Sequence, residues 1–212
     1  KTALRLLQPY RGRVYWYEID VTKLSERKLR KLRKDFQLIQ QDPYGALDPR
    51  LTVYNIVSEG LRVHKLVSSK DEERELVLKT LASVKLIPPE VFAEKKPDEL
   101  SGGQRQRVAI ARALVMRPKF IVADEPVSML DASTRGQVLE IIKDIRDKYG
   151  TSIMFITHDI AIASYISDNI SVLYGGTVVE RADSDTIVKK PLHPYTMALI
   201  QAVPNPNPDI PI

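Results

Sequence analysis

Residues 100–131 read LSGGQRQRVAIARALVMRPKFIVADEPVSMLD, and this stretch joins a predicted helix to a predicted strand. Ser101, Gly102 and Gly103 stand directly before a segment with helical periodicity. Ser101 can cap the helix, and the two glycines let a ligand approach the backbone closely. Because the free N–H groups of a first helical turn point toward negative charge, the pattern predicts an anion-binding helix start.

The predicted strand that follows ends in two acids. Residues 120–123 are an unbroken apolar run, typical of a parallel strand covered on both faces, and Asp124 and Glu125 come next. Ligands of an open α/β sheet bind beyond the carboxyl ends of its strands. Asp124 would hold a magnesium ion (Mg²⁺), directly or through water, and Glu125 would polarise an attacking water. An isolated acid pair would more simply be a loop start, so the neighbouring motifs decide.

The order LSGGQ, apolar strand, DEP and then LD at Asp131 resembles the ATP-binding subunit of an ABC transporter. Two longer stretches, QDPYGALDPR at 41–50 and PLHPYTMALIQAVPNPNPD at 191–209, are similar to the oligopeptide and dipeptide importer branch. The resemblance covers almost the whole chain. It implies an α/β fold, with a P-loop NTPase-type mixed or parallel sheet core and an inserted helical subdomain.

The composition is that of an ordinary globular chain, with 212 residues of which 43% are hydrophobic and 28% charged. No apolar run approaches the roughly 20 residues needed to cross a bilayer. If the chain serves transport, other chains form the pore. The absence of cysteine excludes disulfides, thiolate metal sites and cysteine-ligated iron–sulfur clusters.

The net charge of +5 is concentrated in residues 23–34, KLSERKLRKLRK. Leu24 and Leu29 can form a hydrophobic staple around a Ser25 cap, and Phe36 continues their apolar face. This pattern predicts a surface helix with solvated basic sides. Nucleic-acid contact is the alternative, and it is disfavoured because base-stacking aromatics are not interleaved with the charges.

The chain opens with KTALRLL, residues 1–7. A phosphate-binding loop ends in Gly-Lys-Ser/Thr and runs directly into a helix, so this stretch fits the last two loop residues and the helix. Lys1 is then predicted to reach the β and γ phosphates of ATP, and Thr2 to be a hydroxyl ligand of Mg²⁺. The resemblance implies that the chain begins within this loop. Residues 1–212 alone are therefore expected to bind ATP poorly, because the glycine-rich cradle precedes them.

Two polar residues follow predicted strands elsewhere in the chain. Gln41 follows the strand expected over 36–40, and at the matching family position a glutamine contacts the metal and the attacking water. An amide can do this without adding charge. His158 follows the strand expected over 153–156 and matches a histidine that contacts the γ-phosphate. Either residue alone would more simply be a polar strand end or a structural histidine.

The resemblance implies a head-to-tail dimer with ATP at the interface. One subunit would supply Lys1, Thr2, Gln41, Asp124, Glu125 and His158. The other would supply Ser101, Gly102, Gly103 and Gln104. Asp131 would communicate across the interface, and closure and opening of the dimer would drive the transport cycle.

The implied partners are transmembrane permease subunits, a second ATP-binding subunit that is either identical or different, and indirectly a substrate-binding protein. No nucleic acid is expected. The implied place is the cytoplasmic face of the cell membrane, and the implied cargo is an oligopeptide or dipeptide, with nickel and oligosaccharides as the other cargoes of the branch. An ABC-type ATPase acting on nucleic acid or ribosomes shares the phosphate machinery and is the alternative function.

The expected domains are an ATPase domain at 1–190, with a helical subdomain at about 44–114, and a C-terminal extension at 191–212. The tail after Pro204 is expected to be mobile. A strand is predicted within 13–21, and helices are predicted through 53–61 and 77–84, the second of them ended by Pro88 and Pro89. A further helix is predicted to be capped by Ser133 and stopped by Gly150. A hairpin is predicted to turn at Gly175 and Gly176.

Overall fold

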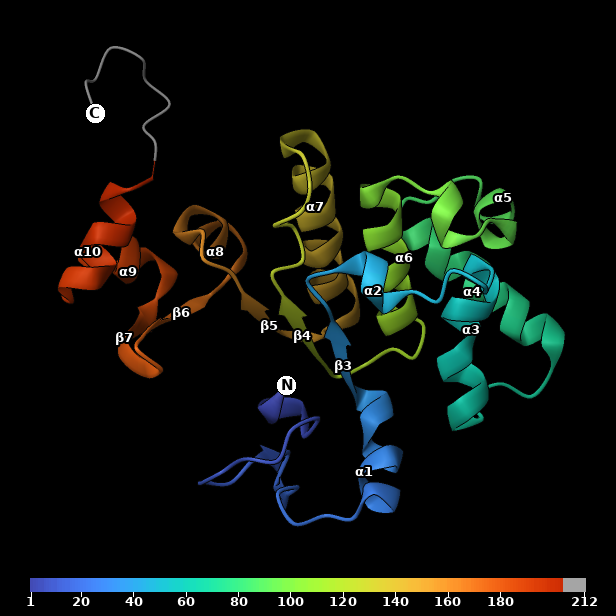
Figure 1. The fold of residues 1–212 in the computed structure, drawn as a ribbon, viewed down its shortest axis with the longest axis horizontal. Coiled ribbons are helices and arrows are strands. Elements are labelled where there is room, and N and C mark those ends of the chain that lie inside the picture. The colour runs from blue at the N-terminus through green and yellow to red at the C-terminus, as the bar shows by residue number, and fades with distance from the viewer. Residues whose placement is uncertain (204–212) are drawn as a thin grey trace. The chain divides into compact units, whose positions relative to one another are not determined.

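The computed structural model describes residues 1–203, and the expected mobile tail after Pro204 lies outside them. The chain divides into two compact units, Lys1–Met154 and Phe155–Ile212. Figure 1 shows the helices and strands of both units. Within residues 1–203, no helix is both long enough and apolar enough to cross a membrane.

A parallel sheet forms the centre of the first unit. Strand β3 (Phe36–Ile39) pairs in parallel with β4 (Phe120–Asp124), and the order of the sheet is β3-β4-β5, where β5 is Ser152–Ile156. The middle of β4 is buried, as expected for a strand covered on both faces. The predicted parallel strand at 120–123 is therefore confirmed.

Helices follow β3 and gather on one side of the sheet (Figure 1). They are α2 (Pro43–Ala46), α3 (Val53–His64), α4 (Lys70–Ser83), α5 (Pro89–Glu94), the 3₁₀ turn η3 (Pro97–Glu99) and α6 (Gly102–Leu114). Both predicted helices of this region are present. The prediction that Pro88 and Pro89 end α4 is wrong, because α4 already ends at Ser83 and Pro89 is the first residue of α5. Proline suits a first helical position, where its missing N–H costs no bond.

The first residues depart from the helix predicted directly after Thr2. Only a 3₁₀ turn, η1 (Thr2–Leu4), forms, and Arg5 ends it in the left-handed region with φ 51°. The Arg5 side chain donates to the carbonyl of Val21 at 3.0 Å, which fixes this turn against the next segment. Tertiary contacts have thus replaced the local helical preference of the sequence.

The expected strand within 13–21 folds back on itself. It forms an antiparallel pair, β1 (Tyr15–Trp16) and β2 (Ile19–Asp20). Tyr17 turns the chain with φ 54°. The reversal places Trp16 in a small core with Val21, and its ring stacks on Phe36 with centroids 4.3 Å apart.

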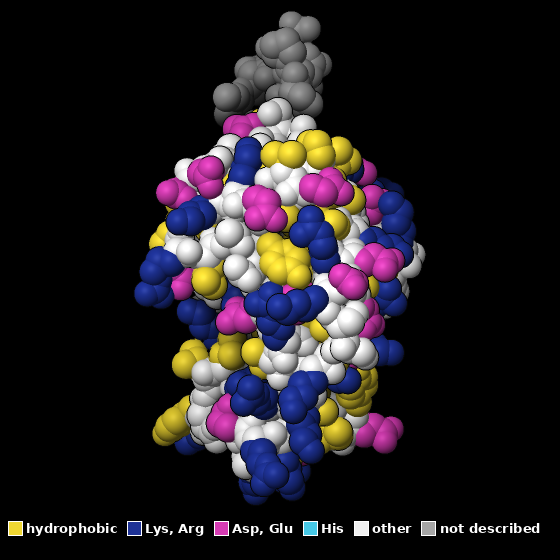
Figure 2. All heavy atoms as spheres, turned by 90° about the vertical axis from the view of Figure 1, so that its right-hand side faces the viewer, with side chains coloured by type: hydrophobic (Ala, Val, Ile, Leu, Met, Phe, Trp, Pro, Cys, Tyr) yellow, Lys and Arg dark blue, Asp and Glu magenta, His cyan; other side chains and the backbone are white. Residues whose placement is uncertain are grey.

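The basic stretch forms a short surface helix, α1 (Glu26–Leu32), followed by the 3₁₀ turn η2 (Arg33–Asp35). Leu29 is fully buried and Leu24 packs in the same cluster, which confirms the amphipathic pattern. Ser25 stands at the cap position, but its side chain makes no cap hydrogen bond. Lys and Arg side chains crowd the lower part of the face drawn in Figure 2, where α1 lies.

Helix α7 (Ala132–Tyr149) connects β4 to β5 and stops, as predicted, at Gly150 with φ 63°. The predicted cap is wrong by two residues. Asp131 is the cap, and its carboxylate accepts the N–H of Thr134, while Ser133 lies in the first turn and donates its hydroxyl to Asp131. Aspartate and serine are both favoured at this position, so composition alone does not separate them.

The second unit is built on the predicted hairpin. It contains α8 (Ile160–Ile166), β6 (Asn169–Tyr174), β7 (Thr177–Asp183), α9 (Ser184–Lys189) and α10 (Pro194–Gln201). Gly175 and Gly176 both have positive φ, 55° and 79°, as a two-residue hairpin turn requires. His193 caps α10, and the Tyr195 ring lies 4.7 Å from that of Tyr174.

Candidate functional site

Gln41 and Glu125 meet at the carboxyl edge of the sheet. Strand β3 ends at Ile39 and β4 at Asp124, and parallel strands present these ends at one edge. The amide nitrogen of Gln41 donates to a carboxylate oxygen of Glu125 at 2.9 Å. The structure therefore brings together two of the predicted catalytic residues, from positions 84 apart in the chain.

Glu125 has an unusual backbone. Its φ is 44°, in the left-handed region that residues with a Cβ seldom adopt. Its carbonyl accepts the N–H of Ser128 at 3.2 Å and the Ser128 hydroxyl at 3.0 Å, so a tight turn holds this conformation. A costly conformation that is held in this way is typical of functional positions. It directs the Glu125 carboxylate out of the line of β4 toward Gln41.

Asp124 and Gln41 offer oxygen ligands at the same edge. Mg²⁺ prefers oxygen and is usually bound through one or two carboxylates together with substrate phosphates and water. Among the described residues, no group of three or more His, Cys, Asp or Glu side chains could hold a metal by itself. The residues present thus fit a Mg²⁺ ion that arrives with a phosphate ligand, and they do not form a complete protein cage.

The start of α6 has the predicted cap. The Ser101 hydroxyl accepts the N–H of Gln104 at 3.4 Å, and the Gln104 side chain accepts the N–H of Ser101 at 3.0 Å. This reciprocal capping box leaves the Ser101 hydroxyl proton free to donate to an anion. Gly102 is half-buried, whereas Gly103 is buried.

The segment after Gln41 rests on α6, a link that the sequence analysis did not identify. The guanidinium of Arg105 lies 4.3 Å from the centre of the Tyr44 ring, and Arg112 donates to the carbonyl of Ala46 at 2.8 Å. Arg105 also donates to the carbonyl of Leu100, the residue before Ser101, at 3.0 Å. The pairs Arg105–Tyr44 and Arg112–Ala46 lie more than 60 positions apart in sequence, so no local pattern could reveal them.

Asp131 is held as a carboxylate. It accepts the Ser133 hydroxyl at 2.6 Å and the Thr134 N–H at 3.0 Å. The Ser133 hydroxyl and then the Thr134 groups hold the pKa of Asp131 far below its usual range. Asp131 is therefore ionised at any physiological pH.

Lys1 and Thr2 belong to the short turn at the start of the first unit. The Trp16 indole donates to the carbonyl of Ala3 at 2.8 Å, and Trp16 stacks on Phe36, the first residue of β3. The turn at Thr2–Leu4 is thus beside the start of β3, whereas Gln41 follows its end. Figure 1 shows the N-terminus on the α1 side of the strand and α2 beyond its tip. The roles of Lys1 at the phosphates and of Thr2 at Mg²⁺ stay predictions.

His158 belongs to the second unit. It is exposed and lies between β5 and α8. The next residue, Asp159, caps α8 by accepting the N–H groups of Ala161 and Ile162 at 2.9 and 3.2 Å. The contact of His158 with a γ-phosphate stays a prediction.

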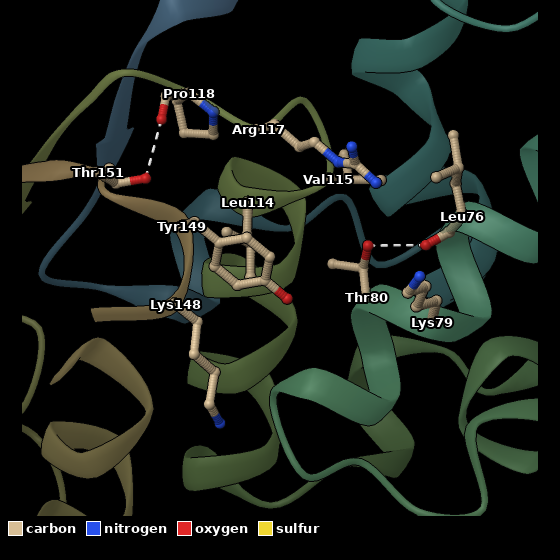
Figure 3. A pocket seen from close by; sticks show the side chains of 10 residues that line it. All are labelled: Leu76, Lys79, Thr80, Leu114, Val115, Arg117, Pro118, Lys148, Tyr149 and Thr151. Atoms are coloured by element: carbon tan, nitrogen blue, oxygen red, sulfur yellow. Dashed lines mark hydrogen bonds between the residues drawn. The ribbon is translucent and has the colours of Figure 1, made fainter. Parts of the chain in front are cut away.

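A separate cavity of about 400 Å³ contains none of these residues. It lies where α4, α6 and α7 end (Figure 3). Both threonines of its lining are bonded to backbone carbonyls, Thr80 to that of Leu76 at 2.7 Å and Thr151 to that of Pro118 at 3.0 Å. The cavity therefore has a structural lining that is distinct from the nucleotide residues predicted above.

Family models match two parts of the chain. The ABC transporter model matches residues 1–128, and a model described as the oligopeptide/dipeptide transporter, C-terminal region, matches residues 179–211. The oligopeptide transport ATP-binding protein OppF of Bacillus subtilis is 43% identical over 99% of this chain and 68% of its own length. A relative from Brucella ovis is 44% identical over 99% of this chain, and the chain spans 65% of that relative.

Solved structures of the same family share the fold. The ATP-binding cassette MJ0796, solved as a dimer in a post-hydrolysis state with ADP and Pi, is 34% identical with a TM-score of 0.76, covering 85% of this chain and 77% of the cassette. The protein cbiO1 of Clostridium perfringens, part of the ABC transporter complex cbiONQ, is 29% identical with a TM-score of 0.77, covering 90% and 73%. With family models, relatives and structures in agreement, the chain belongs to the ABC transporter family of ATP-binding proteins.

Proposed function

We propose that this protein binds and hydrolyses ATP as the subunit that powers an ABC importer for oligopeptides or dipeptides. The observation that carries this proposal is the 2.9 Å hydrogen bond from Gln41 to Glu125 at the carboxyl edge of the sheet. A carboxylate oriented by an amide beside Asp124 is suited to activate water next to a phosphate. The peptide cargo rests on the names of the relatives and on the C-terminal family match.

In this proposal Glu125 takes a proton from the attacking water, and Gln41 holds the carboxylate in place. Asp124 and the Gln41 amide oxygen are the ligands for Mg²⁺, with Thr2 as the hydroxyl ligand. The ion, when bound, supplies positive charge to the phosphates. Lys1 would reach the β and γ phosphates and His158 would donate to the γ-phosphate. These two roles and that of Thr2 rest on the family motifs alone.

The second half of the site comes from a partner subunit in a head-to-tail dimer. Ser101, Gly102, Gly103 and Gln104 of one chain would face the phosphates held by the other, through the free Ser101 proton and the first N–H groups of α6. Asp131 would contact the opposite subunit. The dimeric MJ0796 cassette supports this arrangement, because it holds ADP and Pi in a fold that this chain shares.

The proposed partners are permease subunits of the membrane, a second ATP-binding subunit and, through the permease, a substrate-binding protein. The proposed place is the cytoplasmic face of the cell membrane. The ATPase domain would extend to residue 190, with a helical subdomain at about 44–114. Residues 191–212 would form the extension typical of peptide importers.

Glu125→Gln tests the catalytic proposal in the protein expressed from its natural gene. ATP binding should persist, while the rate of hydrolysis should fall by about 10²–10⁴, the contribution of a general base. Glu75→Gln is the matched control, because Glu75 is an exposed residue of α4 that makes the same change of charge. Unchanged turnover in Glu125→Gln would refute the assignment.

A second experiment tests the transport role. The natural protein is used as bait on detergent-solubilised membranes of its source, and co-purifying proteins are identified by mass spectrometry. Polytopic membrane proteins together with a second ATPase would support the importer. Ribosomal or nucleic-acid components in their place would favour the alternative function and direct attention to α1.

A further inference from the structure

Gly103 and Thr134 are in contact where α6 and α7 begin. A Cβ atom added at Gly103 would overlap the Cγ2 methyl of Thr134. The other Thr134 atoms leave more room, with its Cβ at 3.4 Å and its hydroxyl oxygen at 3.6 Å from that added atom. Real Cβ atoms tolerate the latter distances, so the methyl group alone creates the conflict.

The Thr134 methyl group has little freedom to move away. The Thr134 N–H donates to the carboxylate of Asp131 at 3.0 Å, which holds the Thr134 backbone in the capped first turn of α7. The side-chain torsion of a β-branched residue is restricted in a helix. The position of Thr134 in this turn therefore directs its methyl group at Gly103.

The contact continues along both helices. One turn further on, Arg107 of α6 donates to the side chain of Gln137 of α7 and, at 3.3 Å, to the carbonyl of Lys85. Figure 1 shows α6 and α7 as neighbours. The first turns of the two helices thus form one packed seam rather than two independent loops.

We infer that Thr134 is a positioning residue that locks the Asp131 turn to the start of α6, so that these two parts of the proposed interface move as one body. The inference rests on the proposed function, in which Asp131 and the Ser101–Gln104 segment both face the partner subunit. It means that residue 103 must lack a side chain because of Thr134 in the same chain, whether or not a nucleotide approaches Gly103. A side chain at 103 would push α6 away from Asp131.

The test uses Gly103→Ala, Thr134→Ser and the double variant in the protein expressed from its natural gene. Steady-state ATP hydrolysis gives kcat and KM, and thermal unfolding of each variant is recorded. Serine keeps the hydroxyl and lacks the methyl. Gly103→Ala should lose about tenfold to a hundredfold in kcat, as expected when reacting groups are misplaced by about 1 Å. Thr134→Ser removes the contact without creating an overlap, so it should lower kcat less than Gly103→Ala does. The double variant, in which the alanine methyl takes the place of the threonine methyl, should recover most of the Gly103→Ala loss.

Recovery of kcat in the double variant supports the inference. This holds even if Gly103→Ala alone fails to fold, because the double variant can still be measured. Normal turnover in Gly103→Ala overturns it, since the seam would then tolerate a methyl. A loss that Thr134→Ser does not repair, or a double variant that fails to fold, overturns it as well. The proposed function fails separately, through unchanged turnover in Glu125→Gln.

Discussion

The Gln41 amide and the Glu125 carboxylate are joined by a 2.9 Å hydrogen bond, and the two residues follow adjacent parallel strands. The bond gives Gln41 a second task beside metal ligation, because it fixes the direction of the proposed general base. A residue that changes shape or charge at 41 should therefore alter the chemistry at 125.

Gln41→Glu should move the acid limb of the ATPase pH–rate profile to higher pH. The variant places two carboxylates in contact, and like charges at this distance favour sharing a proton, so more alkali is needed to free the base. Gln41→Ala is the control, since it removes the amide hydrogen bond without adding charge. It should lower kcat and move the limb less than Gln41→Glu does. The pH dependence of kcat distinguishes the two variants. Acid limbs at the same pH in both variants would contradict the contact between residues 41 and 125.

Tyr44→Ala should loosen the segment that carries Gln41. The Arg105 guanidinium lies over the Tyr44 ring, and such contacts at exposed sites contribute about 0.5–1 kcal/mol. Amide hydrogen exchange across residues 41–47 should accelerate by about twofold to fivefold, which corresponds to that loss. Tyr44→Phe retains the ring and should exchange like the parent. Equal protection in the alanine variant would show that α2 is held by Arg112 alone.

Local patterns predicted the elements whose signals lie within a few residues. The start of α6 carried a serine cap and a glutamine three residues later, and the β6–β7 hairpin carried two glycines at its turn. The apolar run of β4 likewise indicated a covered parallel strand. Periodicity, caps and turn residues are read from the chain itself, which is why these elements were placed correctly.

The remaining features depend on contacts between distant positions. The turn at Thr2–Leu4 replaces a predicted helix because Arg5 bonds to Val21, and the Thr134 methyl meets Gly103 from 31 positions away. The Gln41–Glu125 pair was expected at one site only through the family resemblance, since a strand order is needed to place two strand ends together. Sequence patterns show which residue types are present, but they do not show which distant residues come into contact.

Arg62→Ala should destabilise the helical part of the first unit. Glu73 is 6% exposed and accepts Arg62 at 2.6 Å and the Tyr54 hydroxyl at 2.7 Å. Loss of the arginine leaves a buried carboxylate short of donors, and because Arg62 is itself half-exposed the free energy of unfolding should fall by about 1–3 kcal/mol. Urea denaturation at pH 7 measures this. Arg50→Ala, which removes an exposed partner of Asp48, should leave the unfolding free energy nearly unchanged.

The same pair predicts an acid dependence. Hydrogen bonds from Arg62 lower the pKa of Glu73 in the folded protein, so its stabilisation is complete above the ordinary glutamate pKa and is lost as pH falls through the lower, folded value. The difference in unfolding free energy between the parent and Arg62→Ala should therefore narrow below about pH 4.3. A difference in unfolding free energy that stays constant below this pH would contradict the ion pair between Arg62 and Glu73.

His64 should make the first unit less stable at mildly acidic pH. Burial, and then the charges of Arg30 and Lys34, lower the pKa of His64 in the folded protein, and Asp35 opposes them. The unfolded chain takes up a proton near pH 6.5 while the folded chain resists it, so the free energy of unfolding falls as pH drops below about 6.5. His64→Gln should flatten this slope between pH 7 and 5.5 in denaturant titrations. Arg30→Gln should weaken the slope without abolishing it, because burial is the larger cause, and an unaltered slope in His64→Gln would assign the dependence to another group.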